Sequence, residues 1–314
     1  MTLIRRLAPT LPILLVWLAL AEPAAAAWPG QNGAIAFVRS GASARSNSDV
    51  WIETRSGRQR RLTATPRIQE TAPTFSPNGG TIACVRRSSG DADIWLMRRD
   101  IWLMRRDGSG KRALVEGERD ELQPSFFPSG RSLVYTVFDG ERDWIVYSVR
   151  TDGTSKRRQV ADATYPVVSP NGRWLAYSQA GNGGGIRLRN LRSDKVRRLT
   201  TGSAQGLDFS PDGRRLVFVG QRACRPGGNL RFAILSIGLR DRRPSFLRRN
   251  CRGGFAAAAF VPKGRQIVFT RKLQSGRRLG FRLGMMSRHG RPLGGAPRHR
   301  PGTQEQMPSW QPLR

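Results

Sequence analysis

Histidine and cysteine are scarce in this chain of 314 residues. It has 2 His and 3 Cys, and both histidines, His289 and His299, lie near the C-terminal end. Catalytic metal sites and Ser-His-Asp or Cys-His active sites need several of these residue types together. The sequence also lacks the Gly-x-Ser-x-Gly motif of many hydrolases. From these absences we predict no catalytic residues, no metal site, no cofactor and no enzymatic activity.

Acidic residues and lysine are also few. Asp and Glu number 22 against 54 Lys and Arg, and only five of the basic residues are lysine, so the net charge is +32. Arginine pairs such as Arg60-Arg61 and Arg197-Arg198 recur along the chain. A basic rim of this kind attracts anionic wall polymers, lipid headgroups or nucleic acid in a salt-dependent way. Aromatic residues do not interleave with the arginines, which argues against sequence-specific nucleic-acid binding. The arginine excess can equally reflect coding composition.

Beyond its first 27 residues the chain lacks a long apolar run. Residues 1–27 combine Arg5 and Arg6, an apolar stretch from Leu11 to Ala21, and small residues at Ala25-Ala26-Ala27. This order is typical of a secretory signal peptide, and an uncleaved N-terminal anchor is the alternative. We therefore predict a signal peptide at 1–27, an extracytoplasmic (periplasmic or secreted) mature chain from 28 to 314, and no transmembrane span after signal removal.

Secretion permits disulfides, but three cysteines allow few. Cys84 lies in an apolar strand pattern, and we interpret it as a small, buried apolar residue. Cys224 and Cys251 flank two strand-like segments and are a possible disulfide pair. Their spacing in the sequence does not decide whether they are bonded.

Glycine and proline are abundant, with 35 Gly and 20 Pro, and they mark an internal repeat. Each copy has an apolar residue, a variable residue, Pro, a turn ending in Gly, and then an apolar strand. The copies begin at Phe75, Phe126, Val168, Phe209, Phe260 and Trp310. Pro-Asn-Gly and Pro-Asp-Gly are turn signals, because Gly accepts a positive φ and Pro presets φ. The turn glycines recur every 41 to 51 residues, and each unit holds four short strands, which is typical of propeller blades.

The two chain ends complement each other. The N-terminal copy starts at the turn, Asn32-Gly33, without the strand that precedes it, and the C-terminal copy supplies only that strand, Met307 to Pro312. We therefore predict an all-β, six-bladed propeller with four-stranded blades. Its ring closes when the C-terminal strand pairs with the N-terminal blade, which leaves few exposed strand edges. A closed ring of this size fits a monomer.

The repeat resembles that of TolB-type, WD40-like propellers. Pro73-Thr74-Phe75-Ser76-Pro77-Asn78-Gly79 through Asp93-Ile94-Trp95 carries the resemblance, with weaker copies at 124–147 and 207–219. It covers nearly all of residues 31–314. TolB itself has a small α/β domain before such a propeller and acts in a periplasmic envelope complex, and this chain has no room for that domain. The resemblance thus implies the fold and an envelope location. It also admits an alternative, because some enzymes with such propellers are polysaccharide lyases.

One segment is duplicated: Ile94 to Asp100 is repeated at once as Ile101 to Asp107. Because seven is odd, a strand shifted by one copy would exchange its two faces. The second copy adjoins the Asp107-Gly108 turn. We therefore predict that the second copy is the paired strand and that the first lengthens the loop.

Three acidic residues are the candidate binding groups. Glu70, Glu121 and Glu305 each lie three residues before the proline of an inner strand. Inner strands line the propeller channel, so we predict that these residues form an acidic arc at one channel mouth, able to hold a cation or a basic peptide. The alternative is that each accepts local backbone hydrogen bonds at the start of its strand.

The sequence leaves three functions open. The preferred one is a non-enzymatic scaffold at the cell envelope that binds a protein or ligand. The others are a propeller enzyme, a polysaccharide lyase or hydrolase that uses channel carboxylates, and an electrostatic binder of anionic wall polymers. An envelope protein and an anionic wall polymer are the partners these functions imply.

Overall fold

Twenty-four strands and no helix make up the described part of the chain. The computed structural model describes residues 27–41, 47–66, 68–88, 99–140, 143–181, 184–223, 230–250, 253–275 and 278–313. Residues 1–26 of the predicted signal peptide, Cys224 and Cys251, and most of the first copy of the duplicated segment lie outside these ranges.

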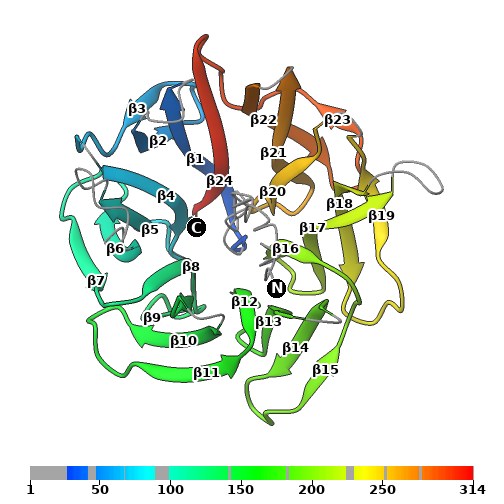
Figure 1. Cartoon of the computed structure of the whole chain (residues 1–314). Helices are drawn as coiled ribbons and strands as arrows, with labels where there is room; N and C mark the ends of the chain where they lie inside the picture. The colour runs from blue at the N-terminus through cyan, green and yellow to red at the C-terminus, as the bar shows by residue number, and fades with distance from the viewer. Residues whose placement is uncertain are drawn as a thin grey trace, which may run out of the picture.

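The strands form six four-stranded antiparallel sheets arranged as a ring (Figure 1). Blade 1 is β24 (Thr303–Leu313), β1 (Gln31–Gly41), β2 (Ser48–Glu53) and β3 (Gln59–Arg61); blade 2 is β4 (Ile68–Phe75), β5 (Thr81–Ser88), β6 (Arg99–Arg105) and β7 (Arg112–Val115); blade 3 is β8 (Asp120–Phe126), β9 (Ser132–Phe138), β10 (Trp144–Arg150) and β11 (Arg157–Ala161). Blade 4 is β12 (Ala163–Val168), β13 (Trp174–Gln179), β14 (Ile186–Asn190) and β15 (Val196–Arg198); blade 5 is β16 (Ala204–Phe209), β17 (Arg215–Ala223), β18 (Leu230–Gly238) and β19 (Ser245–Arg248); blade 6 is β20 (Phe255–Phe260), β21 (Gln266–Ser275), β22 (Arg278–Ser287) and β23 (Pro292–Leu293). The predicted six-bladed all-β propeller is confirmed.

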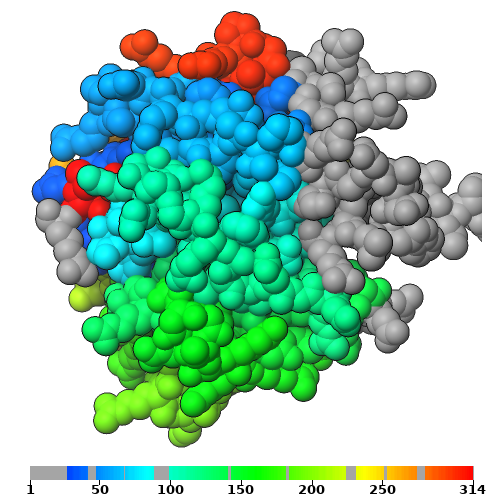
Figure 2. Space-filling model, turned by 90° about the vertical axis from the view of Figure 1, so that its left-hand side faces the viewer, coloured from blue at the N-terminus to red at the C-terminus, as the bar shows by residue number. Residues whose placement is uncertain are grey.

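Blade 1 contains the first and the last of the described strands, β1 and β24. Its inner strand, β24, pairs with β1 from Gln31 opposite Leu313 to Gly41 opposite Thr303. The predicted closure of the ring by the C-terminal strand is therefore confirmed. Figure 2 views the ring from its rim and shows successive parts of the chain next to one another, from blue through green.

The repeated turns have the backbone that their glycines permit. The five turn glycines have φ between 65° and 69°, a left-handed conformation that is unfavourable for residues other than glycine. They are Gly79, Gly130, Gly172, Gly213 and Gly264. At Gly79 the backbone also approaches closely, because an added Cβ would lie 2.5 Å from the carbonyl oxygen of Pro312 in β24. The turn of blade 2 therefore packs directly against the strand that closes the ring.

The inner strands of blades 1 to 5 carry a bulge at the same place in the repeat, seen as a register shift against the next strand, and in β20 of blade 6 the shift lies one residue earlier. At the bulge, five blades have a residue with φ between 48° and 56°: Ala72, Gln123, Tyr165, Gly206 and Met307. These bulges bond to one another between blades. Gln123 Oε1 accepts a hydrogen bond from the Tyr165 amide (2.7 Å), and the Met307 sulfur accepts one from the Ala72 amide (3.4 Å). The bulges therefore help to fix the spacing between neighbouring blades.

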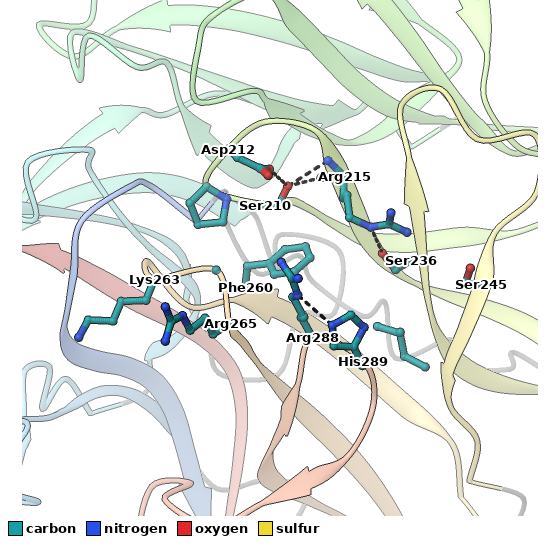
Figure 3. A pocket seen from close by; sticks show the side chains of 13 residues that line it. Ser210, Asp212, Arg215, Ser236, Ser245, Phe260, Lys263, Arg265, Arg288 and His289 are labelled. Atoms are coloured by element: carbon teal, nitrogen blue, oxygen red, sulfur yellow. Dashed lines mark hydrogen bonds between the residues drawn. The ribbon is translucent and has the colours of Figure 1, made fainter.

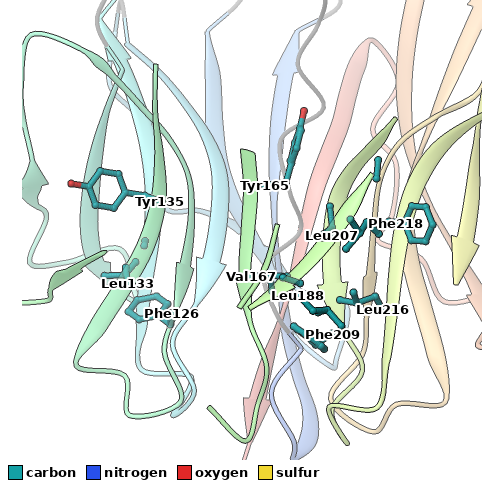
Figure 4. Packing of buried hydrophobic residues seen from close by; sticks show 14 of the residues in the cluster. Phe126, Leu133, Tyr135, Tyr165, Val167, Leu188, Leu207, Phe209, Leu216 and Phe218 are labelled. Atoms are coloured by element: carbon teal, nitrogen blue, oxygen red, sulfur yellow. The ribbon is translucent and has the colours of Figure 1, made fainter. Parts of the chain in front are cut away.

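The largest core cluster extends through four consecutive blades, from blade 2 to blade 5 (Figure 4). Phe126, Val167 and Phe209, from three consecutive inner strands, are each at most 1% exposed. At the first position of the repeat, Phe75, Phe126 and Phe209 are buried, whereas Trp310 is only partly buried and its Nε1 donates to the carbonyl of Gly33. Cys84 is buried among apolar side chains of blades 1 and 2.

The duplicated segment contributes mainly its second copy to the sheet. β6 pairs with β5 in a register that sets Ile101 opposite Val85 and Met104 opposite Ile82. The prediction that the second copy is the paired strand is confirmed. From the first copy, Arg99 and Asp100 extend this pairing.

The duplication supplies a matched pair of substitutions. Ile101 is completely buried, so Ile101→Val is expected to lower the free energy of unfolding by about 1 kcal/mol. Ile94→Val makes the same change in the first copy and is expected to have little effect, because the sequence assigns that copy to a loop. Urea unfolding of both variants checks this. An equal loss in both would contradict the assignment of the first copy to a loop.

Candidate functional site

The three glutamates predicted at the channel mouth all lie on inner strands. Glu70 is in β4, Glu121 in β8 and Glu305 in β24, and their exposures are 2%, 1% and 1%. Each contacts a different set of neighbours. Binding of a cation or basic peptide by these residues stays a prediction.

The charge of Glu305 is balanced by neighbouring basic side chains. Its Oε1 lies 3.1 Å from Nε of Arg39, and its Oε2 lies 2.5 Å from Nδ1 of His299. The Thr303 hydroxyl donates to it as well. Burial opposes ionisation of Glu305, but the hydrogen bonds from His299 and Thr303 and the charges of His299 and Arg39 outweigh burial and lower its pKa. Glu305 is therefore an anion held by blade 1 itself.

Glu70 and Glu121 are in the opposite state. Burial raises the pKa of Glu70 to about 6 and that of Glu121 to about 7. In each, Oε2 is buried and accepts no hydrogen bond from the described residues. The charge of Lys156 lowers the pKa of Glu121, while Asp100 and Asp120 raise it. Both side chains therefore hold a proton more readily than an exposed glutamate.

An open cleft of about 520 Å³ lies between blades 5 and 6, on the face that carries the Pro-Asn-Gly and Pro-Asp-Gly turns (Figure 3). Its floor includes the buried ring of Phe260 and the partly buried Leu247. Ser210, Asp212 and Arg215 from blade 5 line one side. The other side is lined by Lys263, Arg265, Arg288 and His289 of blade 6.

Positive charge dominates this cleft. Lys263, Arg265 and Arg288 are exposed, and none of them forms an ion pair among the residues that the structure describes. Arg215 donates to the Ser236 hydroxyl and lies 3.5 Å from the Asp241 carboxylate at the edge of blade 5. The blade 6 side therefore offers three cations that are free to meet an anion.

The carboxylate and the imidazole of the cleft are held by short-range contacts. Burial opposes ionisation of Asp212, but hydrogen bonds from the Ser210 hydroxyl and the Arg214 amide, with the charges of Arg214 and Arg288, lower its pKa. His289 Nε2 accepts a hydrogen bond from Arg288 Nε at 3.0 Å. Asp212 therefore accepts hydrogen bonds within its own turn, and His289 helps to orient Arg288.

This cleft was not predicted from the sequence. Its basic residues belong to three turns that the repeat separates by tens of residues, and only the ring brings them together. The sequence did contain one signal. In the fifth copy of the repeat the turn glycine lies between Lys263 and Arg265, whereas in the second and third copies the residue before the turn glycine is small or an amide. Comparison of the six turns would have marked blade 6 as the most basic.

Two further absences apply to the described ranges only. No group of three or more His, Cys, Asp or Glu side chains is placed there to hold a metal ion. Nor does that part of the chain contain a helix long and apolar enough to cross a membrane.

The fold and this cleft define a closed six-bladed propeller with an open, basic groove between two of its blades. The family model of the TolB beta propeller domain (PD40) matches residues 24–227. The chain belongs to this TolB propeller family. The structure of TolB from Acinetobacter baumannii superposes with a TM-score of 0.69 at 20% identity, covering 89% of this chain and 67% of that one.

Two curated relatives correct the prediction about enzymatic activity. A Bacillus subtilis protein named "Uncharacterized peptidase YuxL" is 29% identical over 181 residues, which are 54% of this chain and 25% of that protein. "Tricorn protease homolog 1" of Streptomyces coelicolor is 29% identical over 215 residues, 64% of this chain and 19% of that protein. The chain thus spans about a quarter and a fifth of these relatives. The prediction that the chain is not an enzyme is wrong as an inference from missing motifs, because relatives with this repeat are named as a peptidase and a protease homolog.

Proposed function

We propose that this chain is an extracytoplasmic propeller that binds an anionic polymer in the cleft between blades 5 and 6. One observation carries the proposal: three exposed cations, Lys263, Arg265 and Arg288, line an open groove, and none of them forms an ion pair among the described residues. A guanidinium group binds phosphate or carboxylate oxygens through two parallel hydrogen bonds. The apolar floor at Phe260 and Leu247 gives the carbon backbone of a polymer a surface to contact.

The charge of the whole chain supports the same partner. The net charge of +32 draws polyanions toward the surface over a distance set by the salt concentration. Exposed arginines lie on the outer strands of three further blades, as at Arg61 in β3, Arg157 in β11 and Arg197 in β15. These rim charges favour encounter, while the cleft provides a defined place for contact. An extracytoplasmic location rests on the signal-like residues 1–27 and makes wall polymers the relevant anions.

Charge reversal in the cleft tests the proposal. The double variant Arg265→Glu and Arg288→Glu is expected to bind polyphosphate and poly-γ-glutamate about tenfold more weakly than wild type, since two exposed ionic contacts become repulsive. The salt dependence of binding should also become less steep. Fluorescence titration with labelled polymer at low and high salt measures both quantities.

The matched control reverses two exposed arginines of the rim, Arg157→Glu and Arg158→Glu in β11 of blade 3. It changes the net charge by the same amount. If the control weakens binding as much as the cleft variant, binding is a property of the total charge and the cleft has no special role. A protein partner that remains bound at high salt would instead support a scaffold function at the envelope.

A second candidate function is a part in peptide hydrolysis, which the two curated relatives favour by their names. In this function the propeller would bind a peptide, or control its access, next to the groups that catalyse hydrolysis. Incubation of the purified chain with blocked peptides, with mass spectrometry of the products, tests it, and intact peptides would exclude hydrolysis by this chain alone.

A further inference from the structure

The first two described residues, Ala27 and Trp28, form hydrogen bonds with two opposite blades of the ring. In Figure 1 the dark blue start of the described chain lies near the middle of the ring. The exposures of Ala27 and Trp28 are 3% and 2%. Trp28 Nε1 donates a hydrogen bond to the carbonyl of Phe75, at the end of the inner strand of blade 2 (3.3 Å). The backbone nitrogen of Ala27 donates to Oδ1 of Asp208, on the inner strand of blade 5 (2.8 Å). This short segment therefore connects two blades across the centre.

Asp208 is a fully buried carboxylate with no cation beside it. Its second oxygen, Oδ2, accepts from the backbone nitrogen of Phe260 in blade 6 at 2.6 Å. Among the described residues no lysine or arginine forms an ion pair with it. Burial raises the pKa of Asp208 well above its usual range, although the amides of Phe260, Ala27 and Phe209 oppose this. A buried carboxylate of this kind is costly unless a positive charge compensates it.

The sequence before Ala27 offers two bonds to a signal-processing protease. Such enzymes need small residues at the first and third positions before the cut. Cleavage between Ala26 and Ala27 meets this rule through Ala24 and Ala26, and cleavage between Ala27 and Trp28 meets it through Ala25 and Ala27. The sequence analysis placed the boundary at the second bond. The two differ in what they leave at Asp208, because only the first keeps the nitrogen of Ala27.

We infer that the chain is processed between Ala26 and Ala27, and that the new α-ammonium group of Ala27 forms an ion pair with Asp208 inside the ring. Hydrolysis of this amide bond consumes one water molecule, leaves a carboxylate on Ala26 and frees the amine of Ala27, which takes up a proton. The nitrogen that donates to Asp208 thereby gains a full positive charge. The pair would hold Trp28 between the inner strands and link blade 5 to blade 2.

The site of processing is tested first. The full chain is expressed in a secreting bacterium, and the intact mass of the exported protein is measured. A mature chain that begins at Ala27 is the expected result. A chain that begins at Trp28, or that retains residues 1–26, would overturn the inference.

The ion pair is tested by a double-mutant cycle. Two forms of residues 27–314 are compared, one starting at Ala27 and one carrying Ser-Gly before it, which keeps the amide hydrogen bond but moves the charge away. Each form is made with and without Asp208→Asn. The extension is expected to lower the Tm by about 4 °C when Asp208 is present and by less than about 1 °C with Asp208→Asn. Equal shifts in both backgrounds would contradict the pair.

Two further forms keep the test decisive if Asp208→Asn does not fold. Asp194→Asn removes an exposed carboxylate, 72% accessible at its side chain, and must leave the effect of the extension unchanged. Acetylation of the Ala27 amine in the otherwise unaltered protein removes the charge with little added bulk, and it is expected to lower the Tm as the extension does. An acetylated chain with the Tm of the free amine would refute the inference.

Discussion

A chain that ends at Gly302 is expected to lose cooperative folding. This truncation removes β24 (Thr303–Leu313), the inner strand of blade 1. The loss extends to three blades, because β24 pairs with β1, its Ser309 hydroxyl accepts from the Phe75 amide of blade 2, and its Met307 amide donates to Thr270 of blade 6. Without β24 the edge of β1 is open, and such edges pair with other chains.

Thermal unfolding followed by near-UV circular dichroism, together with size-exclusion chromatography, checks this expectation. The truncated chain should show no cooperative transition and should form large species. A synthetic peptide of residues 303–313 added during refolding is the control, since it restores the missing strand in trans. A truncated chain that remains monomeric with an unchanged transition would show that the ring does not depend on its closing strand.

The variant Glu121→Gln is expected to be more stable than wild type at pH 8 and close to it at pH 5. Burial raises the pKa of Glu121 to about 7 in the folded chain, from its usual value of 4.5. The folded state therefore binds the proton more tightly than the unfolded state does. The stability that this provides is fully present below pH 4.5 and is lost as the pH rises through about 7. The shift corresponds to about 3 kcal/mol, and glutamine, which does not ionise, avoids the loss.

Thermal unfolding at pH 5 and pH 8 measures the effect. The Tm of wild type is expected to fall by about 6 °C more than that of Glu121→Gln between these two pH values. Glu305→Gln is the matched control with the opposite sign. The pKa of Glu305 is lowered in the folded chain, so its contribution is present at high pH and lost on acidification. A Glu121→Gln variant that is less stable than wild type at pH 8 would show that the carboxylate is ionised and paired.

The architecture could be read from the sequence because its signals are local and repeated. The Pro-Asn-Gly and Pro-Asp-Gly turns require a positive φ at glycine, and the structure shows that φ at all five turn glycines. The ring closure could be inferred because the two ends carry complementary parts of one repeat. The paired copy of the duplicated segment could be chosen because the second copy adjoins the Asp107-Gly108 turn.

The sites could not be read in the same way because they depend on contacts between blades. Asp208 shows the missed signal: the same position of the other copies holds Thr74, Ser125, Val167, Ala259 and Ser309, so it is the only acid there. Comparison of the copies would have marked it, but not its contact with Ala27, which is 181 residues away. His299 is similar, since it lies in a polar segment rich in Gly, Pro and Arg that gives no sign of its contact with Glu305 in the structure.

The place of Trp28 sets an order of events during synthesis. Trp28 leaves the ribosome among the first residues of the propeller and β24 among the last, yet Trp28 lies in the middle of the ring that β24 completes. Blades 2 to 6 have all their strands in sequence and can pair as they emerge. Blade 1 waits for the end of the chain. The protein must therefore keep an exposed tryptophan and an unpaired β1 until synthesis is complete, and any chaperone that accompanies the new chain has these two elements to protect.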